Sequence, residues 1–410
     1  MERTELAQLL GGSPAVAEPA AGAVVIAERD PNRFRAEFAR AVAGRGPVFL
    51  ADPLWGEAER RELAALIAAA GPAAPEPPAS GRGWLMVASG GTSGRVRFAR
   101  HDEETLAAAV TGFCAHFQVR RVDCLGLLPL HHVSGLLAWF RTLLTGGSYH
   151  PWDWKRLEAG ERPARPRDSD CYCVSLVATQ LQRLLAEPAA AEWLRGFDLV
   201  FLGGGPAWPE LLEAAARERI ALSISYGMTE TAAMVAALRP AEFAAGARSC
   251  GRALPQARIV VGPDRRVSID GPTLFRGYFP AWRSPGPFPT EDLGRWDEEG
   301  HLHILGRRDA VIITGGKKVD PSEVEAVLRS SGEFADVAVV GLPDPEWGQS
   351  VTACYPAEQR PPDLVRVAGS LAGLATFKRP RRYLPAAPWP RNAQGKLNRA
   401  ALQAALERPA

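Results

Sequence analysis

The 410-residue sequence lacks long hydrophobic runs and lacks an excess of charge of either sign. No run approaches the ~20 consecutive apolar residues that a helix needs to cross a bilayer, so we expect no insertion into membranes. Its 48 Lys and Arg residues against 46 Asp and Glu residues leave a net charge of +2, which argues against a nucleic-acid-binding protein. The first ten residues place acidic side chains before a very short apolar stretch, unlike a secretory signal peptide. We therefore expect a cytoplasmic protein.

Cysteine is scarce as well, and the six copies contain no Cys-x-x-Cys pair. Cys171 and Cys173 would point to one face of a strand, but no second pair follows to complete a zinc site. We therefore expect six reduced thiols, most of them in the core, at positions 114, 124, 171, 173, 250 and 354.

The chain is long enough for more than one compact core, so we expect two or more domains. Residues 71–81 are rich in proline and cannot form a helix or a central strand, so they are expected to be a linker. The pattern of expected strands and helices changes near 306–308, where we place a second boundary. These boundaries divide the chain into residues 1–80, 81–306 and 307–410.

Apolar runs alternate with amphipathic helical patterns from residue 84 to residue 224. Such alternation predicts an α/β sheet that binds ligands at the carboxyl ends of its strands. The strands expected here are 84–88, 124–128, 171–176, 199–202 and 221–224, and the helices are 103–117, 135–144, 179–186 and 210–217. Before the linker we expect helices at 33–43 and 57–70 around a strand at 48–50.

From residue 258 onward the expected elements are shorter. Alternating strands at 258–261, 267–269 and 301–305 predict a small β subdomain. A mixed unit follows, with strands at 311–313 and 337–340 around a helix at 321–328. The overall prediction is therefore an α/β protein with a smaller α+β unit at its C-terminal end.

A run rich in glycine and hydroxyl groups, SGGTSGRVR, spans residues 89–97 directly after the apolar segment 84–88. Its glycines allow several backbone N–H groups to converge, and its hydroxyls and two arginines add donors and positive charge, which suits a polyphosphate. The run lacks the Gly-Lys-Ser/Thr ending of the Walker loop, so an ordinary P-loop ATPase is disfavoured. Taken alone, it is about equally well explained as a plain connecting turn.

Five further segments follow this run in a fixed order. They are PLHHVSG at 129–135, LGGGP at 202–206, YGMTET at 226–231, TEDLG at 290–294 with GRRD at 306–309, and PRNAQGK at 390–396. The ordered set resembles the adenylate-forming superfamily of acyl-CoA synthetases, adenylation domains and luciferases over about residues 84–399. The resemblance implies a large N-terminal domain of stacked α/β sheets with a small β subdomain from about residue 250, and a small mobile α+β C-terminal lid domain from residue 307.

The same resemblance implies an ATP-dependent acid:CoA ligase that works in two steps. Mg²⁺-ATP and a carboxylic acid give an acyl-adenylate and diphosphate, and the thiol of coenzyme A then displaces AMP. Bringing an anionic carboxylate against an anionic α-phosphate requires hydrogen-bond donors, a metal and a late-arriving cation. ATP, Mg²⁺ and coenzyme A are thus the expected cofactor, metal and co-substrate, and a small carboxylic acid is the expected partner.

The resemblance also assigns roles to individual residues. Lys396 contacts the carboxylate and the α-phosphate, Thr229 donates to the α-phosphate, Glu230 binds Mg²⁺, His132 gates the acyl tunnel, and the backbone of Asp309 is the hinge. In the nucleotide site Tyr226 stacks on adenine, and Asp292 accepts from the ribose with help from Arg307. The expected nucleotide contacts are Gly91, Thr92, Ser93, Gly94, Arg97, Gly204, Gly205, Pro206, Tyr226, Gly227, Asp292 and Arg307.

Details of the sequence narrow the expected acid. Gly90 and Arg97 stand where most members of the superfamily have Ser and Lys, and residues 129–136 and 175–185 are similar to segments of the branch that activates 2-succinylbenzoate in menaquinone and phylloquinone synthesis. The short N-terminal region looks like the cyanobacterial form of that branch. This acid carries a second carboxylate, and burying it without a partner would be costly. Arg195 is the expected partner, with Arg141 in reserve and Ser134 as a further substrate contact.

Two alternatives stay open. The chain could activate another aryl or medium-chain acid, or it could be a nucleotide-binding regulator that has lost catalysis. Against the second alternative, the four residues that the chemistry most needs, Thr229, Glu230, Asp292 and Lys396, are all present.

Overall fold

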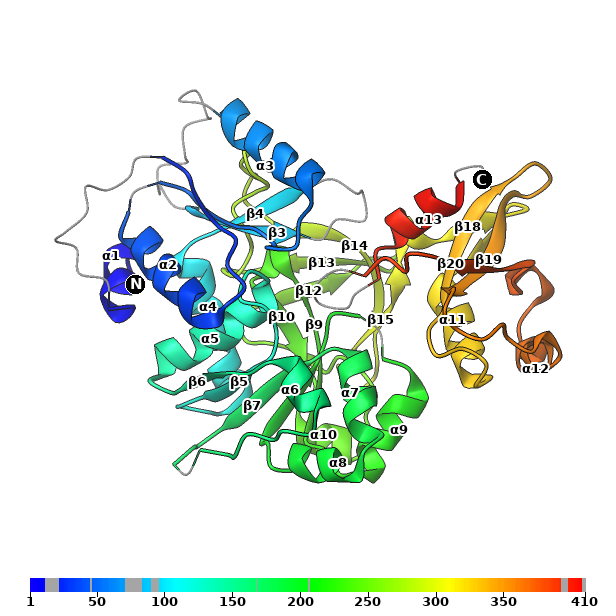
Figure 1. The fold of residues 1–410 in the computed structure, drawn as a ribbon, viewed down its shortest axis with the longest axis horizontal. Helices are drawn as coiled ribbons and strands as arrows, with labels where there is room; N and C mark the ends of the chain where they lie inside the picture. The colour runs from blue at the N-terminus through cyan, green and yellow to red at the C-terminus, as the bar shows by residue number, and fades with distance from the viewer. Residues whose placement is uncertain are drawn as a thin grey trace.

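The strands of the protein form four sheets in the part of the chain described by the computed structural model, which covers residues 1–11, 22–44, 46–70, 83–89, 96–166, 168–205, 207–391 and 397–407. Figure 1 shows the chain running from a blue N-terminal layer, through a large green body, to a yellow and red C-terminal unit on the right. The arrangement is the α/β body with a smaller mixed unit that the alternating pattern predicts.

The first sheet joins residues from both sides of the proline-rich linker. Its order is β1(Val24–Ile26), β2(Val48–Leu50), β3(Leu85–Ser89) and β4(Arg97–His101), with β1, β2 and β3 parallel and β4 antiparallel to β3. The helices of this part are α1(Arg3–Leu9), α2(Pro31–Ala43) and α3(Glu57–Ala70). The expected region before the linker therefore does not form a sheet of its own, because its strands complete a sheet with β3 and β4.

The second sheet has seven strands, in the order β11-β10-β9-β8-β7-β5-β6. Their bounds are β5(Asp123–Gly126), β6(Tyr149–Pro151), β7(Tyr172–Leu176), β8(Leu199–Leu202), β9(Leu222–Met228), β10(Ala233–Ala237) and β11(Arg252–Ala253). The strands from β6 to β9 are all parallel to one another. Their carboxyl ends therefore lie along one edge, and the loops that follow them meet there.

The helices of the body begin and end at residues suited to those positions. Asp102 caps α4(Glu103–Phe117) by accepting from the N–H groups of Glu104 and Thr105. The helix α5(Val133–Thr145) ends at Gly146, whose φ of 70° suits a residue without a Cβ. The remaining helices of this part are α6(Trp154–Glu158), α7(Ala178–Leu185), α8(Pro188–Leu194), α9(Pro209–Arg217), the short 3₁₀ helix η1(Thr229–Thr231) and α10(Pro240–Ala244).

Two further sheets complete the described chain. The third is an antiparallel meander of β12(Arg258–Val261), β13(Arg266–Asp270), β14(Phe288–Trp296) and β15(Leu302–Arg307). The fourth has the order β17-β16-β19-β18, with β20 paired to β19. Its elements are η2(Arg308–Ala310), β16(Ile312–Thr314), β17(Lys317–Val319), α11(Pro321–Ser330), β18(Ala338–Asp344), β19(Gly348–Pro356), α12(Leu364–Ser370), η3(Leu371–Gly373), η4(Thr376–Lys378), β20(Arg382–Ala386) and α13(Arg399–Glu407).

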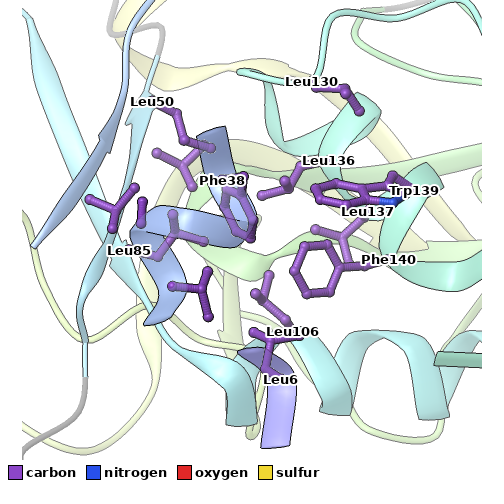
Figure 2. Packing of buried hydrophobic residues seen from close by; sticks show 14 of the residues in the cluster. Leu6, Phe38, Leu50, Leu85, Leu106, Leu130, Leu136, Leu137, Trp139 and Phe140 are labelled. Atoms are coloured by element: carbon purple, nitrogen blue, oxygen red, sulfur yellow. The ribbon is translucent and has the colours of Figure 1, made fainter. Parts of the chain in front are cut away.

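A buried aromatic cluster fixes the N-terminal layer to the body. Figure 2 shows Phe38 of α2 facing Trp139 and Phe140 of α5. The Phe38 ring centroid lies 5.4 Å from that of Trp139 and 5.9 Å from that of Phe140, both in edge-on geometry. Such pairs add to the hydrophobic contribution of burial. The packing of α2 on α5 therefore ties the first sheet to the loop that precedes α5.

Two expectations from composition can be compared with the structure. All six cysteines are free thiols, and four of them are buried. Among the described helices, none combines the length and the apolar character needed to cross a membrane.

Replacing Phe38 with alanine should lower the free energy of unfolding by about 3–5 kcal/mol, because the fully buried ring leaves a cavity between α2 and α5. Urea unfolding followed by circular dichroism measures the change. Val260→Ala, at an exposed position of β12, is the matched control and should shift the value by less than about 0.5 kcal/mol. A loss below about 1 kcal/mol for Phe38→Ala would show that this cluster does not hold the layer in place.

Candidate functional site

Glu230 lies at the meeting point of three chain segments. It belongs to η1, directly after β9, and it is buried. Its Oε1 atom accepts hydrogen bonds of 2.6 Å from the hydroxyl of Ser89, at the end of β3, and from the hydroxyl of Tyr278. Both donors are neutral, so they satisfy the carboxylate oxygen without cancelling its charge. A buried carboxylate of this kind fits a hard divalent cation such as Mg²⁺.

The two end residues of the glycine-rich run lie close to the same group of side chains. Ser89 and Arg97 are paired across β3 and β4, so the chain leaves and re-enters this sheet at one place. The guanidinium of Arg97 stacks on the ring of Tyr278, with 4.6 Å between its central carbon and the ring centroid. Burial, and then the neighbouring Glu230, raise the pKa of Tyr278, so its hydroxyl remains a donor.

His101, the last residue of β4, contacts the backbone of η1. Its Nε2 atom lies 2.7 Å from the carbonyl oxygen of Thr229, and its Nδ1 atom lies 3.0 Å from the hydroxyl of Thr105. A carbonyl oxygen can only accept, so Nε2 carries the proton of the neutral ring. Burial lowers the pKa of His101 to about 4, which keeps the ring neutral near pH 7. This contact positions the Thr229–Glu230 turn.

A second group of polar residues lies where β9, β14 and β15 meet. The hydroxyl of Tyr226 donates to Oδ2 of Asp292 at 2.7 Å, and Arg307 approaches Oδ1 of the same carboxylate at 3.4 Å. Arg307 also pairs side-on with Asp309, with hydrogen bonds of 2.8 and 2.6 Å. Burial and then Asp292 raise the pKa of Tyr226. Asp292 is thereby held in one orientation, with oxygen lone pairs left over for other donors.

Glu291 lies between Thr290 and Asp292 in β14. The segment stays within β14, although its pairing with β13 is irregular between Pro289 and Leu293. Glu291 pairs with Arg266 at 2.8 Å and with Arg308 at 3.0 Å. Thr290 donates to the carbonyl of Val267 and accepts from the N–H of Asp292. Glu291 therefore contributes two ion pairs beside Asp292.

Two of the expected nucleotide-contacting glycines, Gly204 and Gly205, lie in the loop that follows β8, and a third, Gly227, lies near the end of β9. Gly204 has a φ of 82°, which favours glycine, and Gly205 is exposed beside it. A Cβ at Gly227 would lie 2.0 Å from the carbonyl oxygen of Ala233 in β10, so no larger residue fits there. Because glycine has no side chain, the backbone at these positions is not covered by side chains of its own at the carboxyl edge of the parallel strands.

His132 and Ser134 lie at the start of α5, in the loop that leads from β5. The ring centroids of His131 and His132 are 4.3 Å apart. Burial, and to a lesser extent the neighbouring His131, lower the pKa of His132 to about 3. Ser134 is half-buried in the first turn of the helix. The tunnel-gating role of His132 and the substrate contact of Ser134 stay predictions.

The structure does not bring the two expected arginine partners to this edge. Arg195 is exposed at the end of α8 and pairs with Glu218 at 3.0 Å. Both residues precede strands of the parallel sheet, so they lie at its amino edge, opposite the carboxyl ends of β8 and β9 where Gly204 and Tyr226 lie. Arg141 is buried inside the body, with its guanidinium 4.3 Å from the centroid of Phe113 and 5.5 Å from that of Phe201. Neither arginine is placed to bind a second carboxylate of a substrate.

Several predicted residues fall outside the described part of the chain. These are Gly91, Thr92, Ser93 and Gly94 of the glycine-rich run, Pro206, and Lys396. Asp309 is described, in η2 directly after β15, and its hinge role stays a prediction. The loop at 315–319 is a hairpin in which Gly315 and Gly316 both have positive φ and connect β16 to β17.

Sequence reasoning assigned no role to Ser89, Tyr278 or His101, which the structure places around η1. Ser89 belongs to the quoted glycine-rich run, and its place at the end of an apolar strand was an available signal. Tyr278 follows Arg276 and Gly277 in a segment without periodicity, where only a known partner would have drawn attention to it. His101 lies opposite Leu85 in the β3–β4 ladder, which needs the strand register to be known.

Comparisons with known proteins agree on one family. The model of the AMP-binding enzyme family matches residues 18–279, and the model of the AMP-binding enzyme C-terminal domain matches residues 323–396. A 2-succinylbenzoate–CoA ligase of Geobacillus kaustophilus is 32% identical over 320 residues, which are 72% of this chain and 64% of that protein. The chain thus spans somewhat less than two thirds of the length of that curated relative.

Solved structures of similar fold give the same picture. An o-succinylbenzoate CoA synthetase of Bacillus subtilis, in complex with its acyl-adenylate intermediate, superposes with a TM-score of 0.68 at 26% identity, covering 80% of this chain and 69% of that one. The same synthetase with ATP and a magnesium ion superposes with a TM-score of 0.76 at 22% identity, covering 97% and 92%. The second likeness concerns the fold alone.

The neutral state of His101 predicts a dependence of stability on pH. Its pKa is about 4 in the folded chain and 6.5 ordinarily, so the unfolded chain binds the proton first as pH falls. The contribution is complete above pH 6.5 and is lost progressively down to about pH 4. His101→Gln keeps an N–H donor for Thr229 but cannot titrate. Between pH 7 and pH 5, wild type should lose about 2 kcal/mol more unfolding free energy than the variant. Equal losses in urea titrations would contradict the assignment.

Proposed function

Because the chain belongs to the AMP-binding enzyme family, we propose that it is an ATP-dependent acid:CoA ligase that acts through an acyl-adenylate. The observation that carries the proposal is the buried Glu230 carboxylate, held between Ser89 and Tyr278 beside the turn of Thr229. A second carboxylate, Asp292 in β14, accepts a hydrogen bond from the hydroxyl of Tyr226. Such a pair of sites suits a metal-bound triphosphate on one side and a ribose on the other.

The residues of this chain supply binding and orientation. Asp292 accepts from the ribose hydroxyls, Arg307 supports that carboxylate, and the ring of Tyr226 borders the adenine. Glu230 and Thr229 hold the metal and the α-phosphate, and Arg97 supplies permanent positive charge at the exit of the glycine-rich run. Mg²⁺, when bound at Glu230, neutralises phosphate charge and polarises the phosphoryl oxygen. Gly91, Thr92, Ser93 and Gly94 are proposed to donate backbone and hydroxyl groups to the β- and γ-phosphates.

The C-terminal unit is proposed to act as a mobile lid with two working positions. In the first, Lys396 enters the site and contacts the acid carboxylate and the α-phosphate during adenylation. The unit then rotates about the backbone of Asp309, and the hairpin at Gly315 and Gly316 enters for attack by the thiol of coenzyme A. Domain rotation of this kind is a common way to separate two half-reactions. Residues 1–80, 81–306 and 307–410 are the proposed units, with His132 at the acyl tunnel.

The proposed acid is 2-succinylbenzoate, and the product is its CoA thioester for menaquinone or phylloquinone synthesis. The support comes from the relatives that carry this name and from the similarity of residues 129–136 and 175–185 to that branch. The partner of the second carboxylate is unassigned, because Arg195 and Arg141 both lie elsewhere. Another aryl or medium-chain acid is the alternative, and an inactive nucleotide-binding regulator is the second.

A panel of acids tests the proposal. With ATP, Mg²⁺ and coenzyme A, 2-succinylbenzoate should give its CoA thioester by mass spectrometry, together with AMP and acid-dependent diphosphate release. A Glu230→Gln preparation is the control for contaminating ligases and should release diphosphate at least about 100-fold more slowly. Thioesters of other acids alone would establish the first alternative. Nucleotide binding without acid-dependent diphosphate release would establish the regulator.

Replacing Lys396 with alanine should separate the two half-reactions. The rate of adenylation, measured as the release of diphosphate, should fall by at least about 100-fold because the cation that contacts both reacting groups is lost. Thioester formation from presynthesised acyl-adenylate should be unimpaired. Arg195→Ala is the matched cationic control at the opposite edge of the sheet and should leave both half-reactions unchanged. Wild-type adenylation by Lys396→Ala would refute the role.

A further inference from the structure

We propose that Asp52, His131 and His132 form a binding site for a divalent transition-metal ion of the Zn²⁺ type. One ligand atom from each of the three residues lies within 4.8 Å of the others, and Nε2 of His131 is 3.7 Å from Oδ1 of Asp52. This site is distinct from Glu230 and its hydroxyl partners, and the inference does not depend on the proposed ligase activity.

The three residues come from two loops that the fold brings together. Asp52 follows β2 of the first sheet, while His131 and His132 directly precede α5 of the body. The packing of Phe38 on α5 holds these two parts against each other. Oδ1 of Asp52 also accepts from the N–H of Leu54 at 2.9 Å, which fixes the direction of the carboxylate. Support of a ligand by an outer hydrogen bond is a regular feature of metal sites.

The two imidazoles have nitrogen atoms without partners. Nε2 of His131 and Nε2 of His132 are both buried, and neither has a hydrogen-bond partner. A buried ring nitrogen without a partner is costly, so its presence requires an explanation. Burial lowers the pKa of both rings, to about 4 for His131 and about 3 for His132, so each is neutral. A neutral imidazole whose proton is on Nδ1 presents a lone pair at Nε2, as a metal ligand must.

The donor set selects the class of metal. Two imidazole nitrogens and one carboxylate suit Zn²⁺ and the neighbouring first-row ions, whereas Mg²⁺ and Ca²⁺ prefer oxygen ligands only. Tetrahedral bonds of about 2.1 Å place ligand atoms about 3.4 Å apart. The ligand atoms all lie within 4.8 Å of one another, and Nε2 of His131 is 3.7 Å from Oδ1 of Asp52, so small side-chain rotations would close them around an ion. Three protein ligands leave one coordination position for water or an added ligand.

Zinc binding by the full chain, purified without a histidine tag and stripped with a chelator, tests the proposal. Competition against a chromogenic zinc chelator should give one Zn²⁺ per chain, and Co²⁺ in its place should give the visible absorption of a low-coordinate nitrogen and oxygen site. His131→Phe and Asp52→Asn should each weaken Zn²⁺ binding by at least about 10-fold. His150→Phe, a half-buried histidine in β6, is the matched control and should bind like wild type.

Circular dichroism of each variant confirms that it is folded, and the nearly isosteric Asp52→Asn decides the outcome if His131→Phe does not fold. Absence of stoichiometric Zn²⁺ and Co²⁺ binding to the wild-type chain would overturn the proposal. Binding of equal affinity in wild type and in Asp52→Asn would overturn it as well, because the ion would then be held elsewhere. Because metal binding is measured without substrate, these results are independent of the acid panel.

Discussion

The site depends on keeping one carboxylate, Glu230, buried and charged. Burying a carboxylate is costly unless it is hydrogen-bonded, and here the hydroxyls of Ser89 and Tyr278 both donate to its Oε1 atom. The backbone carbonyl of Glu230 also accepts from the N–H of Phe275 at 2.8 Å. Three segments far apart in the sequence are thereby fixed around η1. Glu230 therefore joins the first sheet, the parallel sheet and the segment before β14 at one point, in addition to the packing of Phe38 on α5.

The sequence predicts the elements with strong periodicity and the motifs that lie in connected runs. The helix at 103–117 and the strands at 199–202 and 258–261 have the bounds expected for them, because their patterns and caps are local. The alternation of strand and helix also predicts the α/β class. The two-residue strand β11 and the three-residue strand β1 are not predicted, and they pair with the neighbouring strands β10 and β2.

The site is predictable only where chemistry is carried by a motif. Thr229, Glu230, Tyr226 and Asp292 lie in such motifs, and the structure brings Tyr226 to Asp292. Arg195 illustrates the opposite case. It lies only eight residues before the glycines at 203–205, yet one strand separates them and carries the chain from one edge of the sheet to the other. In a parallel sheet, a residue can contribute to the site only if it lies at the carboxyl edge, so nearness in sequence to a site residue is a poor guide.

The pairing of β2 with β3 has a consequence for how the chain tolerates insertions and deletions. Residues on the two sides of the proline-rich linker are joined by ladder hydrogen bonds and by the packing of Phe38 on α5. The N-terminal layer is thus held to the body by its own contacts as well as by the peptide chain. A change in the number of residues between 71 and 82 alters the path along the chain but not the place of Asp52 beside the loop before α5.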